Sequence, residues 1–389
     1  MANPDRADRP AGVALAGGVG EPADARRLRR LPSLTGLRFV AAALVFVSHT
    51  STLRIFADHD VDTQLARFAP PLGYVAVEFF FILSGFVLTW SARPTDTARA
   101  FWWRRAVKIY PNNVVGCALA VIGIVATGNT VPLGVALPNL FLVQDWAPSV
   151  SVSGGINRPS WSLGCEVLFY LMFPVLLPLM RRIPDRLLWP MVAGIVALIL
   201  LIPTITTLLP GTPPVTGGLS FPQYWFIYVF PVSRLLDFAL GIVLARIVLA
   251  GRWPPLGFGP AAWLATAAVV LVEFVALRYA LVAVMIVPLA LVIGCGAVAD
   301  VRGTPSLMRG RTAVWLGEVS FAFYIVHFLV LFYAHPLVGR WQVDWPAAIG
   351  VYLMLFCVAL GLAALLYHTV ERPLVRAAAR RQREHRLAE

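Results

Sequence analysis

Charged residues are scarce in this sequence. Asp, Glu, Lys and Arg make up only 13% of its 389 residues, whereas hydrophobic residues make up 59%. A soluble domain usually carries charge on about a quarter of its residues. A chain with so little charge cannot cover itself in water, so we expect the lipid bilayer to be the solvent for much of its outside.

Lysine is almost absent, and paired cysteines are missing. Lys108 is the only lysine, and the four cysteines, Cys117, Cys165, Cys295 and Cys357, fall singly inside apolar runs. Such spacing indicates neither a disulfide framework nor a metal site. The net charge of +12 does not call for nucleic acid as a partner, because the cytoplasmic loops of membrane proteins collect basic residues.

Long apolar runs recur along the chain. A helix needs about 20 apolar residues to cross the hydrocarbon core. The runs are too long for a transmembrane barrel and do not alternate with period two. The sequence therefore predicts an all-α integral membrane protein, a polytopic bundle of about ten transmembrane helices. The predicted spans are 34–53, 72–91, 111–127, 161–180, 188–208, 230–249, 261–277, 279–299, 315–334 and 346–368.

The distribution of basic residues sets the orientation. With the N-terminus inside, 25 basic residues fall in inner segments and 5 in outer loops. Because cytoplasmic loops carry the excess of Arg and Lys, we expect both termini to be cytoplasmic. Residues 1–30 lack the pattern of a cleaved signal; we expect them to be a disordered tail, and 374–389 to be a basic tail. A multi-pass protein of the plasma membrane is predicted.

One outer segment, residues 128–160, is long and rich in Pro, Asn, Gly and Ser. Long connections of this kind are often functional. We expect a re-entrant or lid-like loop.

Ionisable residues inside the spans are the main chemical signal, because they are costly there and are usually functional or paired. Arg38 and His49 lie eleven positions apart. On a helix their side chains therefore point within ~20° of the same direction and are separated by ~16 Å along the axis. Glu166 is expected ~7 Å below the outer boundary and His49 ~6 Å below it. His327 and Glu78 fall within one further turn, so an acid–base cluster is predicted. The alternative is that Arg38 snorkels to the inner phosphates and His49 is a hydrogen-bonded core residue.

Such a cluster suits proton abstraction from a hydroxyl, because a carboxylate beside a neutral imidazole fixes its tautomer and raises its basicity. Cys165 adjoins Glu166 but points about 100° away on the same helix. A covalent acyl-cysteine is therefore not expected.

A second group of residues lies in RAFWWRRAVKIYP, residues 99–111. Arg104, Arg105 and Lys108 accompany a tryptophan pair. A short interfacial helix explains such a segment, and so does a clamp for a polyphosphate ligand, because guanidinium groups pair with phosphate oxygens. Arg234 and Asp237 stand at i, i+3, which suggests a structural pair; the sequence leaves their role open.

The sequence resembles the membrane acyltransferase-3 family of bacterial O-acyltransferases over residues 31–373, which we take as one membrane domain. The resemblance rests on several motifs in one order. These are LPSLTGLRFVAAALVFVSH, FFFILSGFVLTW, FWWRRAVKIYP, PSWSLGCEVLFYLMFP, RLLDFALG and SFAFYIVH. Lys108 departs from the family, which often has an arginine there. The first and fourth motifs also resemble the subgroup that acylates macrolide antibiotics.

The resemblance implies roles for particular residues. His49 is the expected catalytic base and Glu166 its acidic partner. Arg38, Arg104 and Arg105 are expected on the acyl-donor side. The remaining expected substrate-binding residues are Trp161, Ser162, Tyr324 and His327.

The resulting hypothesis is transfer of an acyl group from acyl-CoA, acetyl-CoA or another short acyl-CoA, to a hydroxyl of a glycan or a macrolide-like secondary metabolite. No bound cofactor and no metal is expected. A transporter or exporter of a small molecule or glycan precursor is the main alternative, because intramembrane charges can line a translocation path. A non-catalytic scaffold or sensor is a further one.

Overall fold

The structure, a computed structural model, describes residues 30–93, 96–211, 213–339 and 341–388. The tail predicted for residues 1–30 therefore lies, except for Arg30, outside the described residues.

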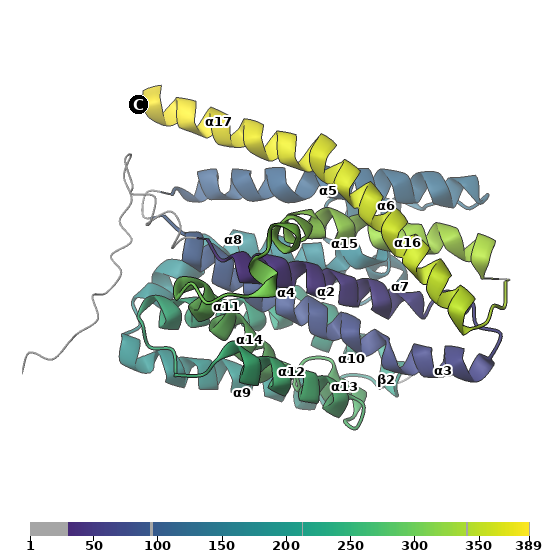
Figure 1. Cartoon of the computed structure of the whole chain (residues 1–389), viewed down its shortest axis with the longest axis horizontal. Helices are drawn as coiled ribbons and strands as arrows, with labels where there is room; N and C mark the ends of the chain where they lie inside the picture. Colours follow the sequence, from purple (N-terminus) through teal and green to yellow (C-terminus); the bar gives the residue numbers. More distant parts are fainter. Residues whose placement is uncertain (1–29, 94–95, 212, 340, 389) are drawn as a thin grey trace, which may run out of the picture.

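Long helices run side by side along one axis of the molecule (Figure 1). In chain order the longer helices are α2 (Pro32–Thr50), α3 (His59–Phe68), α4 (Pro70–Ser91), α5 (Ala98–Ala126), α6 (Leu133–Leu140), α8 (Trp161–Arg181), α9 (Leu188–Ile205), α11 (Pro231–Leu249), α12 (Phe258–Val272), α14 (Ile286–Val301), α15 (Arg311–Val338), α16 (Trp345–Leu366) and α17 (Arg372–Ala388). Short helices α7 (Val150–Ser153), α10 (Phe221–Tyr224) and α13 (Leu277–Ala280) and one antiparallel pair of strands, β1 (Pro214–Thr216) and β2 (Leu219–Ser220), lie in the connections.

Seven helices of the described chain are long and apolar enough to cross a membrane, rather than the predicted ten. The other three predicted spans correspond to α11, α12 and α14. The last two have 15 and 16 residues, which is shorter than the ~20 that cross the hydrocarbon core straight. In α11 the charged residues Arg234, Asp237 and Arg246 interrupt the apolar sequence. The protein is thus an all-helical polytopic membrane protein with seven candidate spans and shorter apolar helices.

The two ends of the described chain lie at the same end of the bundle. In Figure 1 the start of α2 and the end of α17 are both on the left. We call this the inner end and the opposite one, where α2 and α15 finish, the outer end. Residues 374–389, predicted as a tail, belong largely to α17, which continues α16 through the π-helical turn Tyr367–Glu371 and packs on α5.

The basic and aromatic segment 99–111 forms the first part of α5 and not a separate interfacial helix. Thr97 caps this helix, because its hydroxyl accepts a hydrogen bond from the Ala100 amide at 3.2 Å. Arg104, Arg105 and Lys108 therefore stand on a helix that continues directly into a membrane span.

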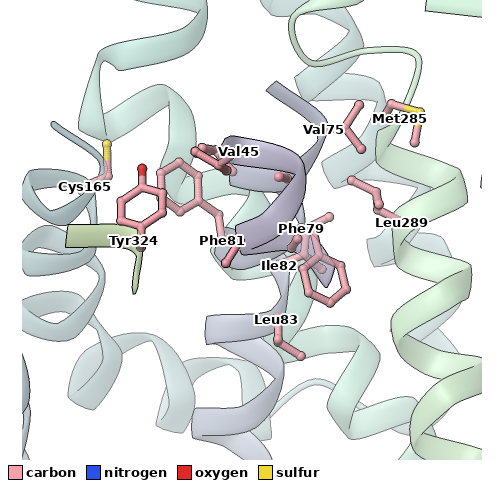
Figure 2. Packing of buried hydrophobic residues seen from close by; sticks show 14 of the residues in the cluster. Val45, Val75, Phe79, Phe81, Ile82, Leu83, Cys165, Met285, Leu289 and Tyr324 are labelled. Atoms are coloured by element: carbon pink, nitrogen blue, oxygen red, sulfur yellow. The ribbon is translucent and has the colours of Figure 1, made fainter. Parts of the chain in front are cut away.

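Two glycines let α4 and α11 cross in contact. A Cβ added at Gly85 would collide with the Phe238 carbonyl, and one at Gly241 would collide with the Ile82 carbonyl. Small residues at such crossings allow close backbone packing in membranes. Figure 2 shows the core around α4. Phe81 lies on the side where Tyr324 and Cys165 are, whereas Val75 lies on the side of Met285. The crossing fixes the position of α4 between α2 and α11.

The connection between α5 and α8 is folded over the outer end. It contains α6, α7 and the 3₁₀ turns Gln144–Trp146 and Arg158–Ser160. Asn139, Gln144 and Asn157 are buried in it and bond to backbone carbonyls. This segment supplies one wall of the cavity described next.

Candidate active site

His49 and His327 form the polar centre of the outer end. Nδ1 of His49 in α2 lies 3.0 Å from Nε2 of His327 in α15. Nδ1 of His327 lies 2.8 Å from the carbonyl oxygen of Tyr324 and 3.2 Å from that of Phe323. Carbonyl oxygens only accept, so His327 carries its proton on Nδ1 and offers a lone pair on Nε2. His49 therefore donates from Nδ1, which leaves its Nε2 as an unprotonated acceptor.

His49 lines a cavity of about 440 Å³ that we call the outer cavity. Aromatic side chains from four segments form much of its wall. They are Tyr74, Trp161, Phe221, Tyr224, Tyr228 and Tyr324. Arg158 is the one arginine among the described lining residues, and no carboxylate is among them.

Tyr324 closes the inner side of the outer cavity. Its hydroxyl donates to the Pro159 carbonyl at 3.0 Å and lies 2.9 Å from the Ser162 hydroxyl. Tyr324 and Val77 also line a small cavity of about 50 Å³ on the other side, where Arg38, Ser162 and Glu166 are found. Tyr324 thus lies between two cavities.

Glu166 belongs to the small cavity and to the next one inward, of about 140 Å³. Its Oε2 accepts a hydrogen bond from the Tyr170 hydroxyl at 2.8 Å. Arg38 and Arg105 line the same inward cavity, and Lys108 does so while forming an ion pair with Glu371. We call these two cavities the passage.

The passage meets a wide cavity of about 550 Å³ at the inner end, which we call the inner cavity. Its arginines come from three places in the chain: Arg93 follows α4, Arg104 and Arg105 belong to α5, and Arg181 ends α8. Arg105 and Leu88 line both the inner cavity and the passage.

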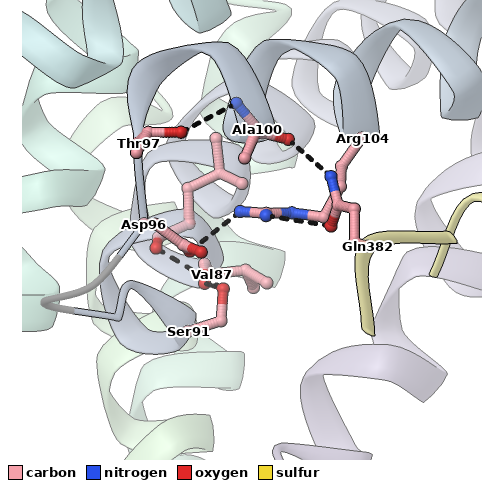
Figure 3. Close-up of polar contacts among 8 residues, drawn as sticks. Val87, Ser91, Asp96, Thr97, Ala100, Arg104 and Gln382 are labelled. Carbon is pink, nitrogen blue, oxygen red and sulfur yellow. Dashed lines mark hydrogen bonds and ion pairs between the residues drawn. The ribbon is translucent and has the colours of Figure 1, made fainter. Parts of the chain in front are cut away.

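The arginines of the inner cavity are held differently. Arg104 forms an ion pair with Asp96 at 2.8 Å and lies 3.4 Å from the Gln382 side chain of α17 (Figure 3). Arg105 packs its guanidinium 5.8 Å from the centre of the Phe101 ring and 5.9 Å from that of Tyr170. Arg105 is thus directed at the mouth of the passage, and Arg104 at the inner cavity.

The predicted site residues therefore lie along one row of cavities. His49, Trp161 and Tyr324 line the outer cavity; Arg38, Ser162 and Glu166 line the passage; Arg104 and Arg105 line the inner cavity. His327 contacts His49 from behind.

Within this row, the hydrogen-bond partners differ from those expected. The family resemblance implied that Glu166 partners His49, whereas the structure gives His49 the partner His327 and Glu166 the partner Tyr170. Glu166 and Tyr170 are one turn apart on α8, which explains their contact.

Glu78 belongs to another group of charges. It is buried on α4, and its electrostatic neighbours are Asp237 and Arg234 of α11. Arg234 and Asp237 form a buried ion pair at 2.6 Å. The Arg234 guanidinium also lies 5.7 Å from the centre of the Tyr228 ring, which lines the outer cavity. The group formed by Glu78, Arg234 and Asp237 therefore packs, through Arg234, against an aromatic residue that lines the outer cavity.

Sequence reasoning missed Arg158, Tyr170, Arg181 and Gln382. Tyr170 stands four residues after Glu166, a spacing that could have indicated their contact. Arg158, Arg181 and Gln382 are ordinary basic or polar residues, and only their positions at the cavities distinguish them.

Residues 31–368 match the acyltransferase domain of the acyltransferase-3 family, and the chain belongs to this family. It is a membrane O-acyltransferase, as the motifs predicted. The acyltransferase alternative is thereby favoured over the transporter and the scaffold.

Relatives support the same class. The chain is 42% identical over 368 residues to Acyltransferase MdmB of Streptomyces mycarofaciens, which covers 92% of this chain and 94% of the relative. It is 26% identical to Exopolysaccharide production protein ExoZ of Rhizobium meliloti, over 78% of this chain and 90% of that protein. It is 27% identical to Peptidoglycan O-acetyltransferase OatA of Listeria monocytogenes, over 58% of this chain and 34% of that protein. No solved structure matches the chain.

Proposed function

We propose that the protein transfers a short acyl group from acyl-CoA to a hydroxyl of a carbohydrate or a macrolide-like metabolite. One observation carries this proposal: neighbouring cavities that share lining residues run from an arginine-lined inner cavity to an imidazole-lined outer cavity. A donor with a phosphate-rich head and a long thioester arm matches that row in charge and shape.

The nucleotide end of the donor binds at the inner end. Guanidinium groups pair well with phosphate oxygens, and Arg93, Arg104, Arg105 and Arg181 line the inner cavity. The acyl-pantetheine arm follows the passage past Arg38 and Glu166 towards Tyr324. We place the inner end and both termini in the cytoplasm of a plasma-membrane protein, in agreement with the excess of basic residues in the inner segments.

His49 acts as the general base. Its Nε2 takes the proton from the acceptor hydroxyl while the oxygen bonds to the thioester carbon. The carbon–sulfur bond then breaks, and the proton passes to the leaving thiolate sulfur. His327 positions His49, because the bond between their nitrogens keeps the basic lone pair of His49 on Nε2.

The acceptor occupies the outer cavity. Aromatic rings such as Tyr74, Trp161 and Tyr228 offer flat faces to the apolar side of a sugar or a macrocycle. The resemblance of the first and fourth sequence motifs to the macrolide-acylating subgroup supports a secondary metabolite, and the similarity to ExoZ and OatA supports a glycan.

The test uses purified full-length protein with radiolabelled acetyl-CoA. Glycosylated macrolides and envelope polysaccharide fragments are offered as acceptors, and labelled ester and free CoA are measured. Ester formation that needs both protein and acceptor is expected, and alkaline hydroxylamine should release the label. A cell extract is offered as a further source of acceptors. If neither the defined acceptors nor the extract takes up label, the proposal is contradicted.

A further inference from the structure

Tyr324 stands where the donor and acceptor halves of the site meet. It is among the lining residues of the outer cavity and of the small cavity of the passage. Along α15, Ser320 and Phe321 face the passage one turn before it, and His327 contacts His49 one turn after it. Tyr324 and Val77 are the two residues that line both cavities, and of these Tyr324 has the larger side chain.

The ring of Tyr324 is fixed at both ends. Its hydroxyl is held by the Pro159 carbonyl and the Ser162 hydroxyl, at 3.0 and 2.9 Å. The ring itself lies 6.1 Å from the Phe80 ring of α4, edge on, and 5.8 Å from the His327 ring. Tyr324 is only 6% exposed. Residues of three helices thus hold the ring across the junction.

The Ser162 hydroxyl belongs to the same clamp. It lies within hydrogen-bond distance of the Pro159 carbonyl, at 3.2 Å, as well as of the Tyr324 hydroxyl. The carbonyl can only accept, so the two hydroxyls share one acceptor. Pro159 and Ser162 together therefore hold the hydroxyl end of the Tyr324 ring.

We infer that Tyr324 is a barrier between the passage and the outer cavity, which keeps water of the outer cavity away from the donor until an acceptor is bound. This inference rests on the proposed function. His49 lines the outer cavity and keeps an unprotonated Nε2, and a base that activates a sugar hydroxyl will also activate water. Sites that handle reactive intermediates commonly exclude water for this reason.

The side reaction that the barrier prevents is hydrolysis of acyl-CoA. In it, the oxygen of water bonds to the thioester carbon while His49 Nε2 takes one water proton. The carbon–sulfur bond breaks, and the proton passes to the thiolate. The products are the free carboxylic acid and CoA, and no oxidant or other reactant is needed.

The test measures this leak directly. Full-length wild type, Tyr324→Phe and Tyr324→Ala are incubated with acetyl-CoA without acceptor, and CoA release is followed with a thiol reagent. Tyr324→Ala removes the ring and should raise hydrolysis by about tenfold, whereas Tyr324→Phe removes only the hydroxyl clamp and should raise it about two- to fivefold. The ratio of hydrolysis to ester formation should rise in the same order.

Tyr333→Phe is the matched control. Tyr333 is on the same helix and also donates to backbone carbonyls, Leu119 at 2.6 Å and Ala120 at 3.1 Å, but lines none of the four cavities. Its loss should leave hydrolysis at the wild-type level.

The outcomes separate the inference from the proposed function. If the Tyr324→Ala variant is folded and still forms ester, but hydrolyses acetyl-CoA no faster than wild type, the inference of a barrier is overturned. If Tyr324→Ala loses both reactions, Ser162→Ala decides, because it weakens the same clamp from α8: raised hydrolysis supports the barrier and unchanged hydrolysis overturns it. If wild type and all variants leave acetyl-CoA intact even with acceptors, the proposed function itself fails.

Discussion

Nδ1 of His49 and Nε2 of His327 lie 3.0 Å apart, although the two residues are 278 positions apart in the chain. The carbonyls of Phe323 and Tyr324 fix the proton of His327 on its far nitrogen. The direction of this hydrogen bond decides which nitrogen of His49 is basic.

The histidine pair predicts a graded loss of activity. His49→Ala removes the base and should lower kcat by about 10²–10⁴-fold. His327→Ala keeps His49 but removes the hydrogen bond that orients its ring. This variant should lower kcat by about a hundredfold or less, with little change in the KM for acyl-CoA. Steady-state kinetics of CoA release with acceptor measure both.

His335→Ala serves as the control for the pair. His335 is an exposed histidine on the same helix α15, and its loss should leave kcat unchanged. Full activity in His327→Ala would show that His49 does not depend on this partner.

The inner cavity predicts which arginine recognises the donor phosphates. Arg181 lines this cavity, whereas the next residue, Arg182, does not. Arg181→Ala should raise the KM for acetyl-CoA about tenfold, because a charge-assisted contact to phosphate is lost. The same variant should use S-acetylpantetheine, which lacks the nucleotide, as well as wild type does.

Arg182→Ala is the control, because it removes the same charge one position away. Equal effects of Arg181→Ala and Arg182→Ala would indicate a general surface-charge effect. Equal effects of Arg181→Ala on both donors would place the phosphates elsewhere.

The crossing of α4 and α11 predicts a stability effect. Gly85→Ala puts a methyl group against the Phe238 carbonyl, and backbone cannot move aside as a flexible side chain can. Overpacking of this kind costs about 1–3 kcal/mol, so the variant should unfold at lower temperature in detergent. Gly350→Ala in α16, where a Cβ meets no atom within 4 Å, should leave the unfolding temperature unchanged. Equal stability of the two variants would contradict the close crossing.

Asp145 predicts a pH dependence of stability. It is fully buried in the connection between α5 and α8, and neither carboxyl oxygen has a hydrogen-bond partner in the described chain. Burial raises the pKa of Asp145 well above its usual range. A carboxyl with a raised pKa in the folded state stabilises the fold below its unfolded pKa of about 4, and this contribution is lost as the pH rises through the folded pKa.

Asp145→Asn removes that titration while keeping the shape. Above about pH 4 the unfolding temperature of wild type should fall as the pH rises, and that of the variant should fall less. Asp60→Asn, at an exposed position of α3, should follow wild type. Parallel curves for wild type and Asp145→Asn would show that Asp145 does not contribute.

Local sequence patterns were sufficient for most of the helices. The apolar runs predicted α2, α4, α8, α9, α15 and α16 with ends close to the observed ones. A helix needs about 20 consecutive apolar residues to cross the hydrocarbon core, and such a run can be recognised from neighbouring residues alone. Seven of the ten predicted spans are long and apolar enough to cross a membrane; of the other three, α12 and α14 are apolar but short, and α11 carries a buried ion pair. Apolarity alone does not tell a span from a helix buried among other helices.

The sequence by itself determined the class of the protein and the spacing of the charges along each helix, because residue number fixes how far apart two residues lie on their own helix. It did not determine which residues on different helices meet. His49 meets His327 and not Glu166, and Tyr324 comes to lie between the two halves of the site. Only tertiary structure decided these contacts, because the rotation of each helix about its axis depends on packing against its neighbours, as at the glycines of α4 and α11.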